Sequence, residues 1–452
     1  MDPLLSRLAN FFGRGGKTLL VGGSPGTGKT TLALQLSQML KPSLTTIIST
    51  RMPEELLFKQ YPWIKKELSN IKVFDFRFGS AEILAQKFIE SVKVEEGLIV
   101  VDSLDSVTRF LSDVEARKFE NAIISIASSQ ANTRTVVTSE ITKGFGEGSP
   151  PLGFAADGIV ELVMRVEHGR VFRKAVLHKL RGSVIDRAEF PFTLTGARIY
   201  SFEAYREHGD ESNLEKKRHR NSGITAGDTV TRTFEKVFGD IEPGCTCLLE
   251  FEADVPINAV MSLIFPRIAE YVVRGGSAYL LPPQQLSPAK LAQIIPRLIP
   301  PRDSAQRLRV WVDLPGFSEP YFFGFTPQSP ESDINSTDKV RSELRQKSVA
   351  HSVLVVRSLD KIEGMFPSRL EEVKGALLRS VATGNAMGDF TLVVSSSTAK
   401  LRDTLLSVST RHYRLEAQSG VVFLHGVKPW TQTHIVGEPP ILGVFPPLFP
   451  VE

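Results

Sequence analysis

Residues 22–31 read GGSPGTGKTT, and this stretch decides the fold of the first part of the chain. From Gly23 to Thr30 it matches the pattern G-x-x-x-x-G-K-[ST] in full. The apolar run KTLLVGG (17–23) precedes the loop, and TTLALQLSQML follows it with helical periodicity. A strand, a glycine-rich loop and a helix in this order predict a phosphate-binding loop.

The residue types of this loop suit a nucleotide. Glycines let backbone N–H groups turn toward phosphates, and the start of the helix adds a partial positive charge. Lys29 is expected to reach the β- and γ-phosphates of ATP, and the Thr30 hydroxyl is expected to ligate Mg²⁺. The predicted nucleotide-binding residues are Gly23, Ser24, Pro25, Gly26, Thr27, Gly28, Lys29, Thr30 and Thr31.

A magnesium site at a phosphate-binding loop also needs a carboxylate at the end of a neighbouring strand. The segment GLIVVDSLDSV (97–107) supplies Asp102 after four apolar residues, so Asp102 and Thr30 are the predicted metal ligands. Asp105, three residues further on, is expected either to assist Asp102 or to cap a helix or face solvent. A further strand, RTVVTSEI, ends in the polar residues Thr138, Ser139 and Glu140, which at this point either sense the γ-phosphate or position water, or simply mark the end of the strand. Strands that alternate with helices predict a parallel α/β sheet with the ligand at its carboxyl edge.

Residues 154–195 carry a more specific signal. The pieces ADGIVEL (156–162), KLRGS (179–183) and FPF (190–192) resemble the strand meander of RecA-like ATPases of the KaiC and RadA group. The variant STRMPEELLFKQYPWI (49–64) looks most like the archaeal gas vesicle protein GvpD and its relatives. The resemblance covers about residues 1–200 well and the rest more loosely.

The resemblance implies further site residues and one departure. Lys179 and Arg181 match a Lys and an Arg that act in the family as charge-stabilising fingers in a neighbouring subunit's nucleotide site. KaiC-like ATPases place a Glu-Glu pair after the second strand to orient the attacking water, but Thr50 and Arg51 stand there in this chain. Lys29, Asp102, Glu140, Lys179 and Arg181 are therefore the predicted catalytic residues of a slow or regulated ATPase.

The second half resembles a copy of the first without its chemistry. Aligning EFEADVPIN (250–258) with the loop sets Phe251 against Gly23, Pro256 against Gly28 and Ile257 against Lys29. LVVRSLDKI (354–362) aligns with IVVDSLDSV (99–107), which sets Arg357 against Asp102. VFLHGVKPWT (422–431) aligns with AVLHKLRGSV (175–184), which sets Lys428 against Arg181. Landmarks in the same order predict an internal duplication.

These observations predict two tandem RecA-like P-loop α/β domains, the second degenerate. The first covers residues 1–203, a charged polar linker covers 204–228, and a pseudo-ATPase domain with a proline-rich tail covers 229–452. Residues 316–339, rich in Pro, Ser and Asp, are expected to form an inserted loop, and the tail is expected to be an extended strap.

Composition narrows the class of protein. The 452 residues are 42% hydrophobic and 23% charged, with a net charge of +4, which is typical of a globular protein without a strong basic footprint. No long apolar run and no signal-peptide pattern is present, so a cytoplasmic protein without a membrane partner is expected.

The predicted function is an ATP- and Mg²⁺-binding regulatory ATPase that acts as a nucleotide-gated switch on a protein partner. A homo-oligomer or ring is an open alternative for its assembly. One alternative function is a RadA-paralog-like mediator that binds single-stranded DNA, for which the EKKRHR cluster (215–220) is the one concentrated basic run. The other is a scaffold in which ATP is structural.

Overall fold

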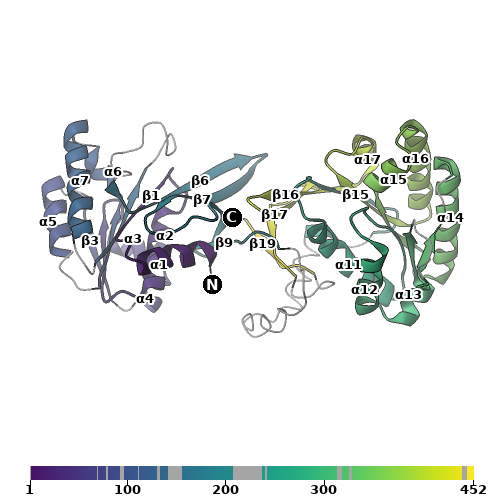
Figure 1. The fold of residues 1–452 in the computed structure, drawn as a ribbon, viewed down its shortest axis with the longest axis horizontal. Coiled ribbons are helices and arrows are strands. Elements are labelled where there is room, and N and C mark those ends of the chain that lie inside the picture. Colours follow the sequence, from purple (N-terminus) through teal and green to yellow (C-terminus); the bar gives the residue numbers. More distant parts are fainter. Residues whose placement is uncertain are drawn as a thin grey trace. The chain divides into compact units, whose positions relative to one another are not determined.

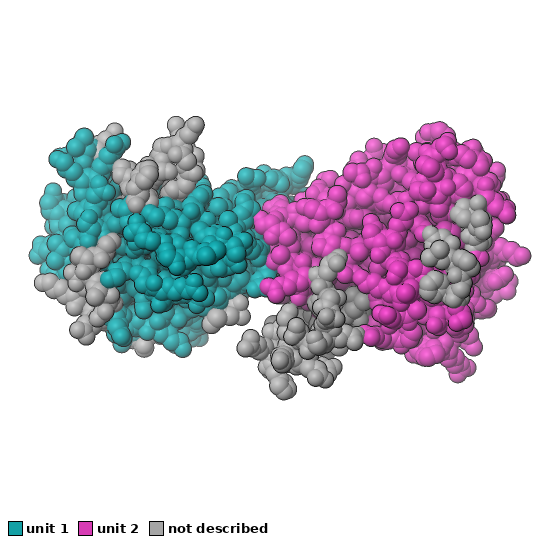
Figure 2. All heavy atoms as spheres, viewed as in Figure 1, with its two compact units in different colours: residues 1–203, 451–452 teal, residues 204–450 magenta. Residues whose placement is uncertain are grey.

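The protein is described by a computed structural model. It describes residues 2–68, 70–77, 80–91, 96–109, 111–129, 133–140, 155–206, 237–239, 242–312, 318–324, 328–439 and 445–451. The chain divides into two compact units, Met1–Glu203 with Val451–Glu452, and Ala204–Pro450 (Figure 2). The EKKRHR cluster and most of the predicted linker lie outside the described residues.

Over its described residues, the first unit is built on a nine-stranded sheet with the order β3-β2-β4-β5-β1-β6-β7-β8-β9 (Figure 1). The strands are β1 Thr18–Gly23, β2 Thr45–Ser49, β3 Ile71–Asp75, β4 Leu98–Asp102, β5 Arg134–Ser139, β6 Gly158–Glu167, β7 Arg170–Leu180, β8 Glu189–Thr195 and β9 Arg198–Ser201. Strands β1 to β6 pair in parallel, and β7 to β9 continue the sheet as an antiparallel meander. Because β1 lies centrally, all of its residues are buried, which explains its unbroken apolar run.

Helices cover both faces of this sheet. One face packs against α1 Pro3–Gly13, α2 Lys29–Leu40, α3 Glu54–Gln60 and α4 Ile64–Glu67. The other packs against α5 Ala81–Ser91, α6 Asp105–Thr108 and α7 Asp113–Ser129. Side chains on successive strand residues alternate between the two cores, so Val100 belongs to the α2 face and Val101 to the α7 face.

The second unit carries a ten-stranded sheet over its described residues, with the order β13-β12-β11-β14-β15-β10-β16-β17-β18-β19 (Figure 1). The strands are β10 Thr246–Phe251, β11 Ser277–Leu281, β12 Leu308–Val312, β13 Phe322–Gly324, β14 Val353–Ser358, β15 Phe390–Ser396, β16 Arg411–Gln418, β17 Val421–Lys428, β18 His434–Val436 and β19 Leu448–Pro450. When β10 is matched to β1, the order of the strands is the same as in the first sheet, and β13 is an additional edge strand. Two such sheets confirm the predicted fold class of tandem RecA-like domains.

The helices of the second unit also form two layers. One face packs against α11 Ile257–Val273 and α12 Pro288–Leu298, with α13 Pro301–Arg307 beside α11. The other packs against α14 Pro330–Lys347, α15 Leu359–Met365, α16 Leu370–Ala386 and α17 Arg402–Val408. The prediction of an inserted loop over 316–339 is wrong where it overlaps β13 and α14. Ser329 caps α14 and Pro330 is its first residue, so the Ser-Pro pair marks a helix start.

Two local features repeat between the units. The central strands β1 and β10 end at Gly23 and Phe251, and the same number of residues separates each end from the following helix. On the side of the central strand away from β5 or β15 lies β6 in the first sheet and β16 in the second. The antiparallel pairing of β6 with β7 and that of β16 with β17 each contain an irregularity at the same position of the strand. These shared features support the duplication that the sequence predicts.

The register of the strands corrects one predicted correspondence. Val101 pairs with Val137 in the first sheet, and Arg357 pairs with Val393 in the second. Val137 and Val393 are equivalent because each pairs with the third residue of its central strand. Arg357 therefore corresponds to Val101 and not, as the alignment predicted, to Asp102.

Asp102 instead corresponds to Ser358, the next residue of β14. Ser358 caps α15, since its hydroxyl accepts a hydrogen bond from the backbone N–H of Lys361. The conclusion that the second unit lacks the strand-end carboxylate holds, but the residue that replaces it is a serine. The side chain of Arg357 lies on the opposite face of the strand, toward α14 and α16.

Lys428 also corresponds to a residue two positions before the one that the alignment predicted. Lys428 pairs with His412 next to the irregularity in β16, and Lys179 pairs with Ile159 next to the irregularity in β6. The register thus matches Lys428 to Lys179 and not to Arg181. Its ammonium donates a hydrogen bond to the carbonyl oxygen of Ser409 at 2.9 Å.

The tail and the helices bear on two further expectations. Part of the tail pairs as β19 with β18 at the edge of the second sheet, an extended conformation as predicted. Among the helices that the structure describes, none combines the length and apolar character needed to cross a membrane.

The buried carboxylate of Asp389 links several elements of the second unit, and its replacement is predicted to lower the stability of that unit. Asp389 is completely buried and accepts hydrogen bonds from Arg341 Nη2 at 2.7 Å, Arg345 Nη2 at 2.7 Å and the N–H of Val353 at 3.0 Å. Asp389→Asn removes the charge and is expected to cost about 1.5–3 kcal/mol of stability. Hydrogen exchange of the amides in β14 and β15 measures it. Asp403→Asn, an exposed carboxylate on α17, is the control, and equal protection in the two variants would contradict the prediction.

Candidate functional site

The phosphate-binding loop begins where β1 ends and stops where α2 begins. Gly23 has φ of +150°, and a Cβ on it would collide with the carbonyl oxygen of Leu162. Gly28 precedes α2 with φ of +100°, in the left-handed region that favours glycine. These two glycines let the backbone turn from the strand into the helix, which leaves the first N–H groups of α2 at the carboxyl edge of the sheet.

Lys29 lies inside this loop. Its ammonium donates hydrogen bonds to the carbonyl oxygens of Gly23 at 2.7 Å and Ser24 at 3.0 Å. The side chain is buried, and burial, followed by the nearby charge of Arg51, lowers the pKa of Lys29. The carboxylates Glu140 and Asp102 act in the opposite direction. A buried ammonium held by two neutral carbonyls favours an anionic ligand such as a phosphate.

Three oxygen-bearing side chains meet beside the loop. Thr30 Oγ1 donates to Asp102 Oδ2 at 2.7 Å, and Thr138 Oγ1 donates to Asp102 Oδ1 at 2.6 Å. Asp102 ends β4, Thr138 lies near the end of β5 and Thr30 lies in the first turn of α2. Asp102 is buried, and these two hydroxyl groups hold both of its carboxylate oxygens in place. The structure thus brings the two predicted metal ligands into direct contact.

A second polar group lies at the same edge of the sheet. Arg51 forms an ion pair with Glu140, and its Nε donates to Ser103 Oγ at 3.0 Å. Asp105 accepts hydrogen bonds from Ser139 Oγ at 2.9 Å and from the backbone N–H of Glu140 at 2.7 Å. The expectation that Asp105 caps a helix or faces solvent is wrong, because its carboxylate anchors the end of β5.

Lys179 and Arg181 lie elsewhere in the unit. Arg181 Nη1 donates to Asp157 Oδ1 at 2.9 Å, and Asp157 also accepts from the hydroxyl of Thr18 at 3.1 Å. Thr18 begins β1, whereas the phosphate-binding loop follows its last residue. Burial, followed by the charge of Arg181, lowers the pKa of Lys179. The two basic residues therefore lie at the end of β1 that is remote from the P-loop of their own unit.

The corresponding loop of the second unit has lost the groups that a phosphate needs. Phe251 is buried at the position of Gly23, Pro256 precedes α11 without a donor N–H, and Ile257 replaces the lysine. Near the end of β10, Arg402 forms an ion pair with the buried Glu250. Residues 251–257, which the structure describes in full, include neither a lysine nor a glycine.

Comparison with known proteins agrees with this geometry. Residues 8–178 match the family model described as the P-loop domain of the GvpD gas vesicle protein. Over these residues the first unit is similar to the GvpD P-loop domain. This confirms the resemblance that the meander and the 49–64 segment predicted.

Two relatives from Halobacterium salinarum extend the likeness over both units. The protein GvpD2 is 24% identical over 473 residues, which covers 96% of this chain and 91% of the relative. GvpD1 is 22% identical over 524 residues, which covers 96% and 92% of the two chains. Among solved structures, a KaiC-like protein from Pyrococcus horikoshii shares 19% identity with a TM-score of 0.36, covering 41% of this chain and 89% of its own. The chain is thus similar to GvpD proteins over 96% of its length.

Sequence reasoning missed two residues of the site. Thr138 was recognised only as part of a polar strand end, although it holds the second oxygen of Asp102. Arg51 was noted as a departure from the Glu-Glu pair, but not as the partner of Glu140. The signal for both was their position at the ends of parallel strands, which meet at one edge of the sheet.

Proposed function

We propose that the first unit binds ATP with Mg²⁺ and hydrolyses it slowly, and that its nucleotide state controls a protein partner. The observation that carries the proposal is the direct contact between Thr30 and Asp102 next to the buried ammonium of Lys29. A hydroxyl and a carboxylate are the hard oxygen donors that Mg²⁺ prefers. Mg²⁺ held by these two residues would neutralise charge on the β- and γ-phosphates.

Slow turnover follows from the residue at the second strand end. Where KaiC-like ATPases carry a carboxylate to orient water, this chain places the cation of Arg51. The nearest substitute is Glu140, and its carboxylate is paired with Arg51. The ion pair with Arg51 holds the Glu140 carboxylate in place and so restrains how it can orient a water molecule. We assign Glu140 the role of positioning water or sensing the γ-phosphate under this restraint.

Replacing Asp102 by asparagine tests the magnesium assignment. Asp102→Asn keeps the size of the side chain but removes the charge that would face Mg²⁺. The variant is expected to lose the gain in ATP affinity that Mg²⁺ gives, about 10- to 100-fold for a charged contact of about 1.5–3 kcal/mol. ATP titrations with Mg²⁺ and with EDTA measure it. Affinity in EDTA should stay close to that of the unaltered chain, and an intact Mg²⁺ effect would refute the assignment.

The partner is proposed from the relatives, whose family is named for gas vesicles. A nucleotide-gated switch requires that ATP and ADP bind two states of the chain with different affinity for the partner. The chain can be immobilised and exposed to an extract of cells that contain gas vesicle proteins. Its affinity for the captured partner should differ about 5- to 150-fold between ATP and ADP, the usual range of allosteric coupling. The Lys29→Ala chain should show no difference, and capture that ignores nucleotide in the unaltered chain would support a scaffold instead.

A further inference from the structure

A buried arginine replaces a core valine in the second unit. Val101 is fully buried among apolar side chains on the α7 face of the first sheet. Its counterpart Arg357 is only 3% exposed on the equivalent face of the second sheet. Loss of the magnesium site explains Ser358 at the position of Asp102, but it does not require a cation on the opposite face of the strand. Arg357 therefore calls for a separate explanation.

The guanidinium of Arg357 is incompletely compensated. Among the described residues its side chain donates one hydrogen bond, from Nη2 to Ser380 Oγ at 3.0 Å. The nearest carboxylate oxygen, Asp338 Oδ1, lies 3.9 Å away and is 2.6 Å from Arg341 Nη1. A guanidinium has five N–H donors, and burying it without partners is costly. Burial also lowers the pKa of Arg357 to about 10.

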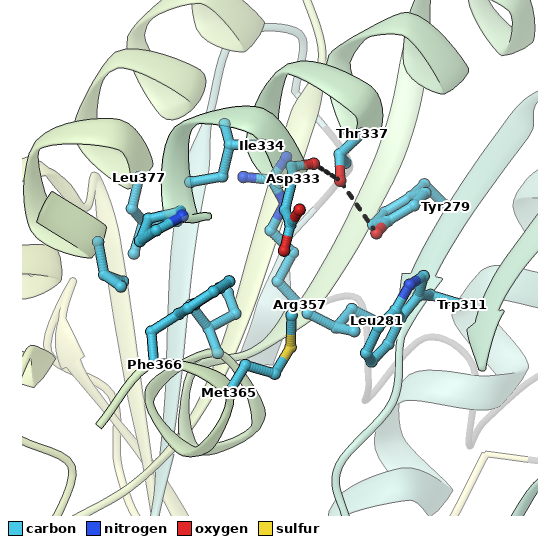
Figure 3. Close-up of a pocket in the computed structure, with 13 residues that line it drawn as sticks. Tyr279, Leu281, Trp311, Asp333, Ile334, Thr337, Arg357, Met365, Phe366 and Leu377 are labelled. Atoms are coloured by element: carbon cyan, nitrogen blue, oxygen red, sulfur yellow. Dashed lines mark hydrogen bonds between the residues drawn. The ribbon is translucent and has the colours of Figure 1, made fainter. Parts of the chain in front are cut away.

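Arg357 lines a cavity between the sheet and the helices α14, α15 and α16 (Figure 3). Asp333, on the first turn of α14, lines the same cavity and is 5% exposed. Among the described residues, its carboxylate oxygens accept hydrogen bonds from the backbone N–H of Gln328 at 3.2 and 3.3 Å, and burial raises the pKa of Asp333. In the part of the chain that the structure describes, no ion pair joins Arg357 to Asp333. The cavity thus presents a basic and an acidic side chain that are not paired with each other.

The remaining wall of the cavity is mostly apolar. Tyr279 and Thr337 bring their hydroxyl oxygens to 3.5 Å of each other on one side (Figure 3). The other lining side chains are hydrophobic and include Leu281, Trp311, Ile334, Met365, Phe366 and Leu377. A ligand for this cavity combines an anionic group, a cationic group and an apolar body.

We propose that this cavity of the second unit is a binding site for an α-amino acid with an apolar side chain. The carboxylate of the ligand pairs with Arg357, its ammonium pairs with Asp333, and its side chain packs against Met365 and Phe366. A simple carboxylic acid would leave Asp333 unpaired, and an amine would leave Arg357 unpaired, and each unpaired buried charge opposes binding. The zwitterion neutralises both charges at once.

The ligand preference can be measured on the full chain without any substitution. Isothermal titration with leucine, isoleucine, valine, methionine and phenylalanine is expected to detect binding of at least one of them. For leucine, 4-methylpentanoate lacks only the ammonium and isopentylamine lacks only the carboxylate. Each analogue is expected to bind about 10- to 100-fold more weakly, which is the loss of one charged contact. No binding of any of the five at concentrations up to about 10 mM, or equal binding of 4-methylpentanoate, would overturn the proposal.

Substitutions test which residues hold the ligand. Arg357→Met keeps an unbranched side chain in the apolar wall and is expected to weaken amino-acid binding about 10- to 100-fold. Arg379→Met on α16 is the matched control, since the Arg379 side chain is 65% exposed, and this variant should bind the amino acid like the unaltered chain. Asp333→Asn should reduce the difference in binding affinity between leucine and 4-methylpentanoate. Unchanged affinity in Arg357→Met would overturn the assignment, and the analogue series decides it if that variant does not fold.

Discussion

Replacing Lys179 and Arg181 together by alanine is expected to slow ATP turnover by about 10³–10⁵-fold, the range that a charge-stabilising finger contributes. Binding of ATP should change little. The physical reason is that a finger neutralises charge that develops on the transferred phosphoryl group, so it acts on the transition state more than on bound ATP. Single-turnover hydrolysis of bound ATP measures the rate, and titration measures the affinity. Unchanged turnover would rule out the finger role.

The position of these residues sharpens the experiment. Because Arg181 pairs with Asp157 near the start of β1, it does not reach the P-loop of its own unit. We therefore expect the fingers to act on the site of another copy of the chain. A mixture of Lys29→Ala protein with the Lys179→Ala/Arg181→Ala protein should recover turnover, because each supplies what the other lacks. Arg165→Ala, exposed on the same hairpin, is the control and should leave the rate unchanged.

Lys29→Ala is expected to abolish measurable ATP binding by the whole chain. Removing one partner of a buried charged contact costs about 2–5 kcal/mol or more, which lowers affinity about 30-fold to several thousand-fold. The substitution also leaves the carbonyl oxygens of Gly23 and Ser24 without the hydrogen bonds that the ammonium donates. Equilibrium titration with a fluorescent ATP analogue measures the loss.

The matched control is Lys41→Ala, an exposed lysine that ends the same helix. It should bind nucleotide like the unaltered chain. Retained stoichiometric binding in Lys29→Ala would show that the second unit binds nucleotide despite Phe251, Pro256 and Ile257. ATP should likewise not stabilise the isolated segment from about residue 223 onward, if that segment folds alone.

Much of the first unit was predictable because its signals are local. The P-loop places the turn, the helix start and the phosphate contacts within one short stretch, from Gly23 to Thr30. Asp102 was predictable because an apolar run ending in a carboxylate is typical of a buried strand that reaches the ligand edge. In the second unit, Ser329 and Pro330 were equally local helix signals, but the composition around them favoured a loop. A loop was predicted because Pro and Ser are together typical of loops, whereas Ser followed directly by Pro is typical of the start of a helix.

The sequence by itself determined that this chain has one complete phosphate-binding loop and a second copy without one. Only the tertiary structure decided which side chains face each other. Arg51 meets Glu140 because two strand ends, far apart in the chain, lie at one edge of the sheet. Arg357 lines a cavity with a mostly apolar wall and does not stand at the strand position that corresponds to Asp102, because strand side chains alternate between faces. With a period of two, a shift of one residue in the alignment moves a side chain to the other side of the sheet.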